Sequence, residues 1–258
     1  MTDRDFSRLA DFHRLGDDPV PDVVVELAAG RALELAWRNE SGGLTFRFAD
    51  EFVKWNPRSS GIDLQRERDR LHWLAHRHPV PPVVSFGSDD DVQWLVTEAI
   101  PGGSAVGDTW RARRSEAIHA IATGLRAVHA VPIDEVPSAW WPSASWPAAS
   151  WPSASWTESW VGRAPASLGP RPPIDDPVLA HGDACAPNTL IGADGEWTGH
   201  VDLGDLGVGD RWADLAIASL SLDWNFGEGH QAELFDAYGI EPDEDRIRYY
   251  RALWHQES

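Results

Sequence analysis

Residues 181–188 are His-Gly-Asp-Ala-Cys-Ala-Pro-Asn, a segment in which four residues separate Asp183 from Asn188. Fourteen residues after Asn188 comes Asp202-Leu203-Gly204, at the end of a strand predicted at 199–201. An Asp in such a loop can orient a substrate hydroxyl and accept its proton, whereas an Asn and a second Asp supply oxygens to Mg²⁺. The tripeptide His-Gly-Asp alone occurs by chance. The loop, the strand and Asp-x-Gly in this order predict a kinase-type catalytic loop.

The cationic residues indicate a second part of the same site. The chain has 22 Lys and Arg residues, and Lys54 is its one lysine. Lys54 lies on a strand predicted at 52–55, and Glu67 lies on a helix predicted at 62–77. A strand Lys held by a helix Glu places an ammonium group on nucleotide phosphates. The alternative for Glu67 is a solvated position among the other charges of that helix.

The order of predicted elements indicates an α+β protein with two lobes. We expect a small antiparallel-sheet N-lobe with one helix (residues 1–97), a hinge (98–103) and a larger, mainly helical C-lobe (104–258). The segment Ser41-Gly42-Gly43 lies between two strands, where its N–H groups could approach a phosphate or form a plain hairpin turn. The remaining predicted elements are strands at 33–38, 44–48, 83–87 and 93–97, a short helix at 22–29, and helices at 111–129, 210–222, 230–238 and 243–254.

Several stretches together resemble the aminoglycoside phosphotransferases, particularly the 3′-phosphotransferase branch. The matching stretches are 52–55 (FVKW), 64–74 (LQRERDRLHWL), 94–102 (WLVTEAIPG), 179–188 (LAHGDACAPN) and 200–218 (HVDLGDLGVGDRWADLAIA). The resemblance implies a protein-kinase-like fold, ATP or GTP as phosphoryl donor, two Mg²⁺ ions and a small cationic acceptor. The hydroxyl of an aminoglycoside is then the expected acceptor, and antibiotic resistance the expected outcome.

The resemblance also implies a role for each matched site residue. It makes Asp183 the catalytic base and Asn188 and Asp202 the metal ligands. Asp210 and Asp214 are expected to brace the helical lobe rather than touch substrate. The expected nucleotide contacts are Lys54, Glu67, Ser41, Gly42, Gly43, Glu98 and Ile100.

Three departures from that branch all concern the acceptor. Asp205 stands where the branch usually has Arg, and the chain ends at 254–258 without the branch's acidic and aromatic tail. Residues 140–160 form a Trp-Pro-x-Ala-Ser repeat where the branch usually has two acidic helices. The repeat could be a linker that tolerates expansion, a platform of indole rings for a cationic or sugar-like ligand, or a segment that packs on the C-lobe. Acidic side chains expected to recognise amines are Asp205, Asp223 and Glu257. Alternative functions are a kinase of another small alcohol, amino sugar or nucleoside antibiotic, and a non-catalytic nucleotide-binding pseudokinase.

The composition and net charge of the chain limit the kinds of partner that it can bind. The formal net charge of −19 over 258 residues argues against nucleic-acid binding, which needs Lys and Arg to neutralise phosphates, and favours a cationic ligand. We expect no membrane span, because no apolar run approaches the roughly 18–20 residues required. The single cysteine, Cys185, and a start without signal-peptide character favour a cytoplasmic setting. We expect a monomer or a homodimer.

Overall fold

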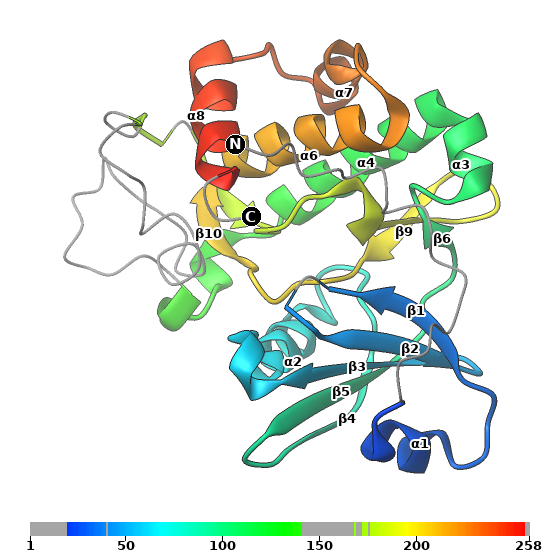
Figure 1. The fold of residues 1–258 in the computed structure, drawn as a ribbon. Helices are drawn as coiled ribbons and strands as arrows, with labels where there is room; N and C mark the ends of the chain where they lie inside the picture. Colours follow the sequence, from blue (N-terminus) through cyan, green and yellow to red (C-terminus); the bar gives the residue numbers. More distant parts are fainter. Residues whose placement is uncertain (1–19, 40, 141–167, 169–171, 175, 256–258) are drawn as a thin grey trace. The chain divides into compact units, whose positions relative to one another are not determined.

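The computed structural model describes residues 20–39, 41–140, 168, 172–174 and 176–255. The chain forms two compact units, which are considered separately below (Figure 1). The first unit comprises Met1–Ala75 and Val80–Ile100, and the second comprises His76–Pro79 and Pro101–Ser258. The change from one unit to the other after Ile100 falls inside the segment 98–103.

The first unit is built on one five-stranded antiparallel sheet in the order β1-β2-β3-β5-β4. Alternating apolar residues and the turn signals between them predicted every one of these strands to within two residues at each end. In the register of the sheet, Lys54 lies opposite Thr45 on one side and Leu95 on the other. The strands are β1 (Glu34–Arg38), β2 (Leu44–Phe48), β3 (Glu51–Pro57), β4 (Val83–Ser88) and β5 (Val92–Glu98).

Among the described residues, two helices accompany this sheet, α1 (Asp22–Ala28) and α2 (Leu64–Leu74). Helix α1 agrees with the short helix predicted at 22–29, and the N-lobe therefore has one helix more than its expected architecture. Helix α1 places Val24 and Ala28 in the core formed with the sheet. Helix α2 packs on β4 and β5. It begins later than the predicted 62–77, because Asp63 caps it by accepting from the N–H groups of the first turn, and it ends at Leu74. A short 3₁₀ turn, η2 (Arg58–Ser60), precedes it.

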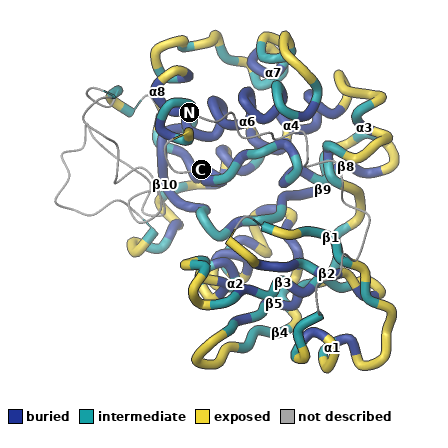
Figure 2. The backbone as a smooth tube through the Cα atoms, in the orientation of Figure 1, coloured by how far each residue is buried: buried dark blue, intermediate teal, exposed yellow. Residues whose placement is uncertain are grey.

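The second unit is mainly helical, and its helix α6 is buried along most of its length (Figure 2). A helix surrounded by apolar contacts belongs in the centre of a core. Helix α4 packs on α7, and α8 packs on α6. The helices among the described residues of this unit are α3 (Asp108–Ala112), α4 (Arg114–His129), α6 (Arg211–Phe226), α7 (Gln231–Tyr238) and α8 (Glu244–Trp254). Two 3₁₀ turns, η3 (Ile133–Glu135) and η4 (Ser138–Trp140), follow α4.

One helix predicted for this unit is not continuous in the structure, so that prediction is wrong in this respect. The expected helix at 111–129 is divided into α3 and α4 at Arg113, whose backbone angles (φ −116°, ψ 46°) leave the helical region. No Gly or Pro marks the break. It lets Trp110 enter the core while Arg113 lies over the Trp110 ring and pairs with Glu116. Of these contacts, the burial of Trp110 is tertiary, and helical periodicity does not reveal it.

Short strands hold the loop at 181–188 in the second unit. Strand β7 (Pro177–Ala180) pairs with β10 (Gly207–Asp210), and β6 (Gly103–Ser104), β8 (Thr189–Ile191) and β9 (Trp197–His200) form a second sheet. The loop begins where β7 ends, and the 3₁₀ turn η7 (Ala186–Asn188) leads into β8. The strand predicted at 199–201 is therefore β9, which ends two residues before Asp202.

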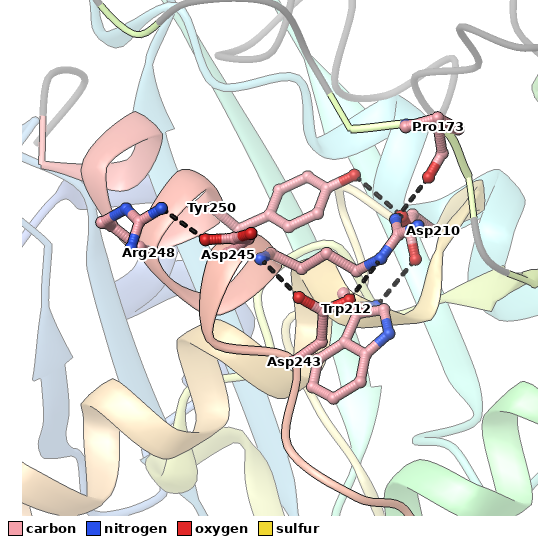
Figure 3. Close-up of polar contacts among 8 residues, drawn as sticks. Pro173, Asp210, Trp212, Asp243, Asp245, Arg248 and Tyr250 are labelled. Carbon is pink, nitrogen blue, oxygen red and sulfur yellow. Dashed lines mark hydrogen bonds and ion pairs between the residues drawn. The ribbon is translucent and has the colours of Figure 1, made fainter.

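Asp210 connects α6 with α8 (Figure 3). Its Oδ1 accepts from the Trp212 N–H at 3.1 Å and caps α6, while its Oδ2 accepts from Arg246 at 2.8 Å and from the Tyr250 hydroxyl at 3.2 Å. The carboxylate is fully buried, so these charge-assisted bonds offset the cost of removing it from water. Among the described residues, no helix combines the length and apolar character needed to cross a membrane.

Candidate active site

The loop at 181–188 closes on itself through Asn188. The Asn188 amide Nδ2 donates to the Asp183 backbone oxygen and to Asp183 Oδ2, each at 3.0 Å. The Asp183 N–H donates to His181 Nδ1 at 3.2 Å, and His181 Nε2 bonds the Val201 carbonyl at 3.1 Å. Because a carbonyl can only accept, His181 carries its ring proton on Nε2. The histidine therefore connects the loop to the segment just before Asp202.

Gly182 is required by the shape of this loop. Its backbone has a φ of +86°, which side-chain-bearing residues rarely adopt. A Cβ at this position would also overlap the carbonyl of Asp205. The close approach brings the backbone of Asp205, one of the residues expected to recognise amines, directly against the catalytic loop.

The carboxyl group of Asp183 has one oxygen that the described residues leave without a partner. Its Oδ1 is buried and has no hydrogen-bond partner among the described residues. Burial, followed by the nearby charge of Asp202, raises the pKa of Asp183, while His181 and the hydrogen bonds of Cys185 and Asn188 oppose that rise. A buried carboxyl oxygen without a partner is costly unless a ligand meets it.

Asp202 completes this half of the site. It has a φ of +62°, a left-handed conformation that costs a residue with a Cβ on the order of 1 kcal/mol. The Val201 N–H donates to the Asn188 backbone oxygen at 3.0 Å, which fixes the Asp202 segment to the end of the loop. The second unit thus brings together Asp183, Asn188 and Asp202.

The oxygen donors of Asn188 and Asp202 fit Mg²⁺. Both protons of the Asn188 amide are used on Asp183, which leaves its carbonyl oxygen as an acceptor. Carboxylate oxygens of Asp183 and Asp202 lie close enough for their charges to interact. Oxygen-only ligands are those that Mg²⁺ prefers.

Asp214 on α6 braces the start of the loop. Its Oδ2 accepts from the His181 N–H at 2.6 Å and bonds His129 Nε2 at 2.9 Å, and its Oδ1 accepts from the Gly182 N–H at 3.0 Å. The other nitrogen of His129 contacts the Tyr238 hydroxyl at 2.8 Å. Burial alone would raise the pKa of Asp214, but the His129 hydrogen bond and the charges of His129 and His181 lower it. The bracing roles predicted for Asp210 and Asp214 are confirmed.

The first unit holds the Lys54–Glu67 pair. Lys54 Nζ lies 2.6 Å from Glu67 Oε1. Glu67 is buried, so its alternative assignment to a solvated helix face is wrong. The Lys54 side chain keeps 21% exposure, compared with 7% for Glu67. The carboxylate therefore fixes an ammonium group that remains partly open to solvent.

The other residues predicted to contact nucleotide lie at or just beyond the ends of strands of the same sheet. Gly42 and Gly43 form a closed turn, in which the N–H of Gly42 donates to the backbone oxygen of Asn39 and that of Gly43 to Asn39 Oδ1. This arrangement favours the plain hairpin over a phosphate loop. Glu98, exposed at the end of β5, donates its N–H to Pro82, and Ile100 ends the unit.

The residues predicted to recognise amines are only partly described. Asp223 on α6 accepts from Gln231 at 3.0 Å through Oδ2 and lies 3.7 Å from Arg251. Its Oδ1 is buried and makes no hydrogen bond to the described residues. Burial raises the pKa of Asp223, although Arg251 and Gln231 oppose the shift. Glu257 and residues 141–160 of the repeat lie outside the described residues.

Sequence reasoning missed a buried histidine pair beside the site. His78 Nε2 lies 2.9 Å from His200 Nδ1, and the two rings stack. Burial, then the charges of His181 and His129, lowers the pKa of His78 to about 3. No local signal could have paired residues that are 122 positions apart.

A family model described as a phosphotransferase enzyme family matches residues 24–250. The chain belongs to this family. This phosphotransferase is 36% identical over 218 residues to the aminoglycoside 3′-phosphotransferase of Streptomyces fradiae, covering 76% of the chain and 81% of the relative. It is 32% identical over 270 residues to the streptomycin 3″-kinase of Streptomyces griseus, covering 93% of the chain and 98% of the relative.

Solved structures agree with the sequence relatives. An aminoglycoside 3′-phosphotransferase of type VIII superposes on this phosphotransferase with a TM-score of 0.69 at 26% identity, covering 90% of this chain and 97% of that chain. The predicted resemblance and fold class are therefore confirmed. The chain is a phosphotransferase with an alcohol group as acceptor, as predicted.

Proposed function

We propose that this phosphotransferase moves the γ-phosphoryl group of ATP or GTP to a hydroxyl of an aminoglycoside. The observation that carries the proposal is the carboxyl group of Asp183. Its Oδ1 is buried without a hydrogen-bond partner among the described residues, its Oδ2 is held by Asn188, and Asp202 is close enough to shift its pKa. The activities named for the relatives from Streptomyces fradiae and Streptomyces griseus support an aminoglycoside as acceptor.

Each residue has a distinct part in the transfer. Asp183 Oδ1 accepts a hydrogen bond from the acceptor hydroxyl and takes its proton as the bond to phosphorus forms. Asn188 and Asp202 would hold Mg²⁺, which would neutralise negative charge on the nucleotide phosphates. Lys54, oriented by Glu67, pairs with the nucleotide phosphates. Positioning and electrostatics provide nearly all the catalysis in such transfers, which suits a rigid, buried loop.

The acceptor is a small polycation in this proposal. The net charge of −19 favours encounter with a cationic molecule, and Asp205 and Asp223 are proposed to meet its amines. Replacement of either by Asn should raise the KM for the acceptor and leave the KM for the nucleotide unchanged. Asp236→Asn is a suitable control, because Asp236 is an exposed carboxylate on α7. An unchanged acceptor KM in both site variants would remove these residues from the acceptor site.

The test of the function is mass spectrometry of products from a panel of acceptors incubated with Mg²⁺ and either ATP or GTP. The panel holds kanamycin, neomycin, streptomycin, an amino sugar and a nucleoside antibiotic. Addition of one phosphoryl group to kanamycin or neomycin supports 3′-type transfer. Addition to streptomycin alone supports a 3″-type acceptor, a second candidate favoured because the streptomycin 3″-kinase aligns with 93% of this chain. Nucleotide binding with no product from any acceptor would contradict the proposal.

A further inference from the structure

The 3₁₀ turn η7 in the catalytic loop is capped by a residue from another helix. The first N–H groups of a helix have no acceptors within it and need outside partners. Cys185, the N-cap residue of η7, forms no side-chain bond to the turn. The Ala186 N–H instead donates to Ser221 Oγ on α6 at 2.9 Å, across 35 positions of sequence. Ser221 therefore provides the missing acceptor.

A chain of hydrogen bonds fixes the Ser221 hydroxyl in place. Asn225, one turn further along α6, donates from Nδ2 to Ser221 Oγ at 3.2 Å and to the Ser221 backbone oxygen at 2.8 Å. Arg111 on α3 donates to the Asn225 backbone oxygen at 2.9 Å and to Asn225 Oδ1 at 3.5 Å. Ser221 is completely buried and Asn225 is 7% exposed. Ser221 and Asn225 of α6 thus connect this helix to η7 and to α3 within the second unit.

The position of this turn determines the geometry of the site residues. The turn closes when the Asn188 N–H donates to the Cys185 backbone oxygen at 2.9 Å. Asn188 is its last residue and holds the Asp183 carboxylate. Ser221 also lies close enough to hydrogen-bond the Cys185 thiol, whose pKa is raised by burial first and then by Asp183. Movement of the turn would displace Asn188 and Asp183 together.

We propose that Ser221 is a positioning residue for phosphoryl transfer: by capping η7 it holds Asn188 and Asp183 in reacting geometry, and Asn225 and Arg111 hold its hydroxyl. Ser221 touches no substrate and acts through the Ala186 N–H. The inference rests on the proposed function. A displacement of about 1 Å at reacting groups can cost on the order of 100-fold in rate.

The kinetic test compares Ser221→Ala with a matched control, Ser219→Ala. Both serines are fully buried on α6, and Ser219 Oγ also makes two hydrogen bonds, to the Ala216 oxygen and from Arg251, each at 2.8 Å. Loss of the η7 cap should lower kcat by about 10- to 100-fold with both KM values within about threefold. Ser219→Ala should retain kcat within about twofold, and Ser221→Thr should restore most of the activity. Equal kcat values for Ser221→Ala and Ser219→Ala would overturn the proposal.

Two readouts are independent of activity. Cys185 is the one cysteine, so labelling by a thiol-reactive disulfide reports on this loop alone. The labelling rate should rise at least about tenfold in Ser221→Ala and stay unchanged in Ser219→Ala. In the unmodified protein, NMR should show slow hydrogen exchange at the Ala186 amide, although the first N–H of a helix usually exchanges fast. Fast exchange there would contradict the cap even if Ser221→Ala did not fold.

These results separate the two proposals. If the unmodified protein phosphorylates no member of the panel, the proposed function is wrong, while Cys185 labelling and Ala186 exchange still decide whether Ser221 caps the turn. If the protein is active but Ser221→Ala resembles Ser219→Ala, the positioning role is wrong and the proposed function stands.

Discussion

Asn188 donates both protons of its side-chain amide to Asp183, one to the backbone oxygen and one to Oδ2, at 3.0 Å each. The bonds fix the carboxylate and leave its Oδ1 without a hydrogen-bond partner among the described residues. They also leave the Asn188 carbonyl oxygen for a cation. One side chain therefore sets the direction of both the proposed general base, Asp183, and its own carbonyl oxygen as a proposed metal ligand, and that relationship leads to the following predictions.

Replacement of Asp183 should impair the phosphoryl-transfer step without impairing nucleotide binding. Asp183→Asn keeps the shape of the side chain but removes its capacity to take a proton. We expect kcat to fall about 10²- to 10⁴-fold, with the Kd for nucleotide within about threefold. The control is Asp134→Asn at an exposed aspartate of η3. Retention of kcat by Asp183→Asn would exclude Asp183 as the base.

Lys54 and Glu67 should act as one unit. Truncation of one partner in a desolvated charge pair typically costs 2–5 kcal/mol, so Lys54→Ala should lower kcat/KM by roughly 100-fold. Glu67→Gln should lower it less, because the ammonium group remains. The double variant should be no worse than Lys54→Ala, as expected when residues share one interaction. Strictly additive losses would show that the pair has no common role.

Asp214 should matter for stability as well as for activity. Asp214→Asn places an amide NH₂ where the carboxylate accepts from the N–H groups of His181 and Gly182. Loss of such a buried, charge-assisted network should reduce the free energy of unfolding by about 3 kcal/mol. Chemical denaturation measures this loss, with Asp236→Asn on the surface of α7 as the control. A change below about 1 kcal/mol would contradict the bracing role.

The buried histidine pair should make the fold sensitive to acid. His78 has a pKa of about 3 in the folded protein, against 6.5 as its ordinary value, and the groups around it are His200, His181, His129 and Trp197. On acidification the unfolded chain binds a proton that folded His78 does not. The contribution of His78 is therefore complete above about pH 7 and is lost as the pH falls from 6.5 towards 3.

Denaturation at different pH values tests this expectation. Between pH 7 and pH 5, His78 should account for a loss of about 2 kcal/mol in the free energy of unfolding. His200, whose pKa is lowered mainly by burial, should add to the loss. The variant His78→Gln should be less stable at pH 7 and should lose about 2 kcal/mol less over the same range. Parallel pH profiles for both proteins would show that His78 titrates normally.

The parts of the site that are close in sequence could be predicted from it. Asp183 and Asn188 share one loop, and Asp202 follows after a strand, so their spacing alone identifies the chemistry. Lys54 and Glu67 were found because a strand and the next helix are neighbours in both sequence and space. Pairs of this kind can be predicted from local periodicity together with a known architecture.

The supporting contacts were not predictable because they join distant segments. Ser221 lies 35 residues from Ala186, and His78 lies 122 residues from His200. The helix break at Arg113 has no Gly or Pro to mark it and lies beside the buried Trp110. Burial of Glu67 likewise depends on packing, since the neighbouring charges in its helix left a solvated position open as the alternative.

The most direct test of the central claim is the initial rate of ADP release from MgATP by the purified protein, with and without an aminoglycoside, compared with Asp183→Asn. The account predicts release that depends on the aminoglycoside and falls at least about 100-fold in the variant. Aminoglycoside-independent release, or equal rates in the two proteins, would contradict transfer of the phosphoryl group through Asp183.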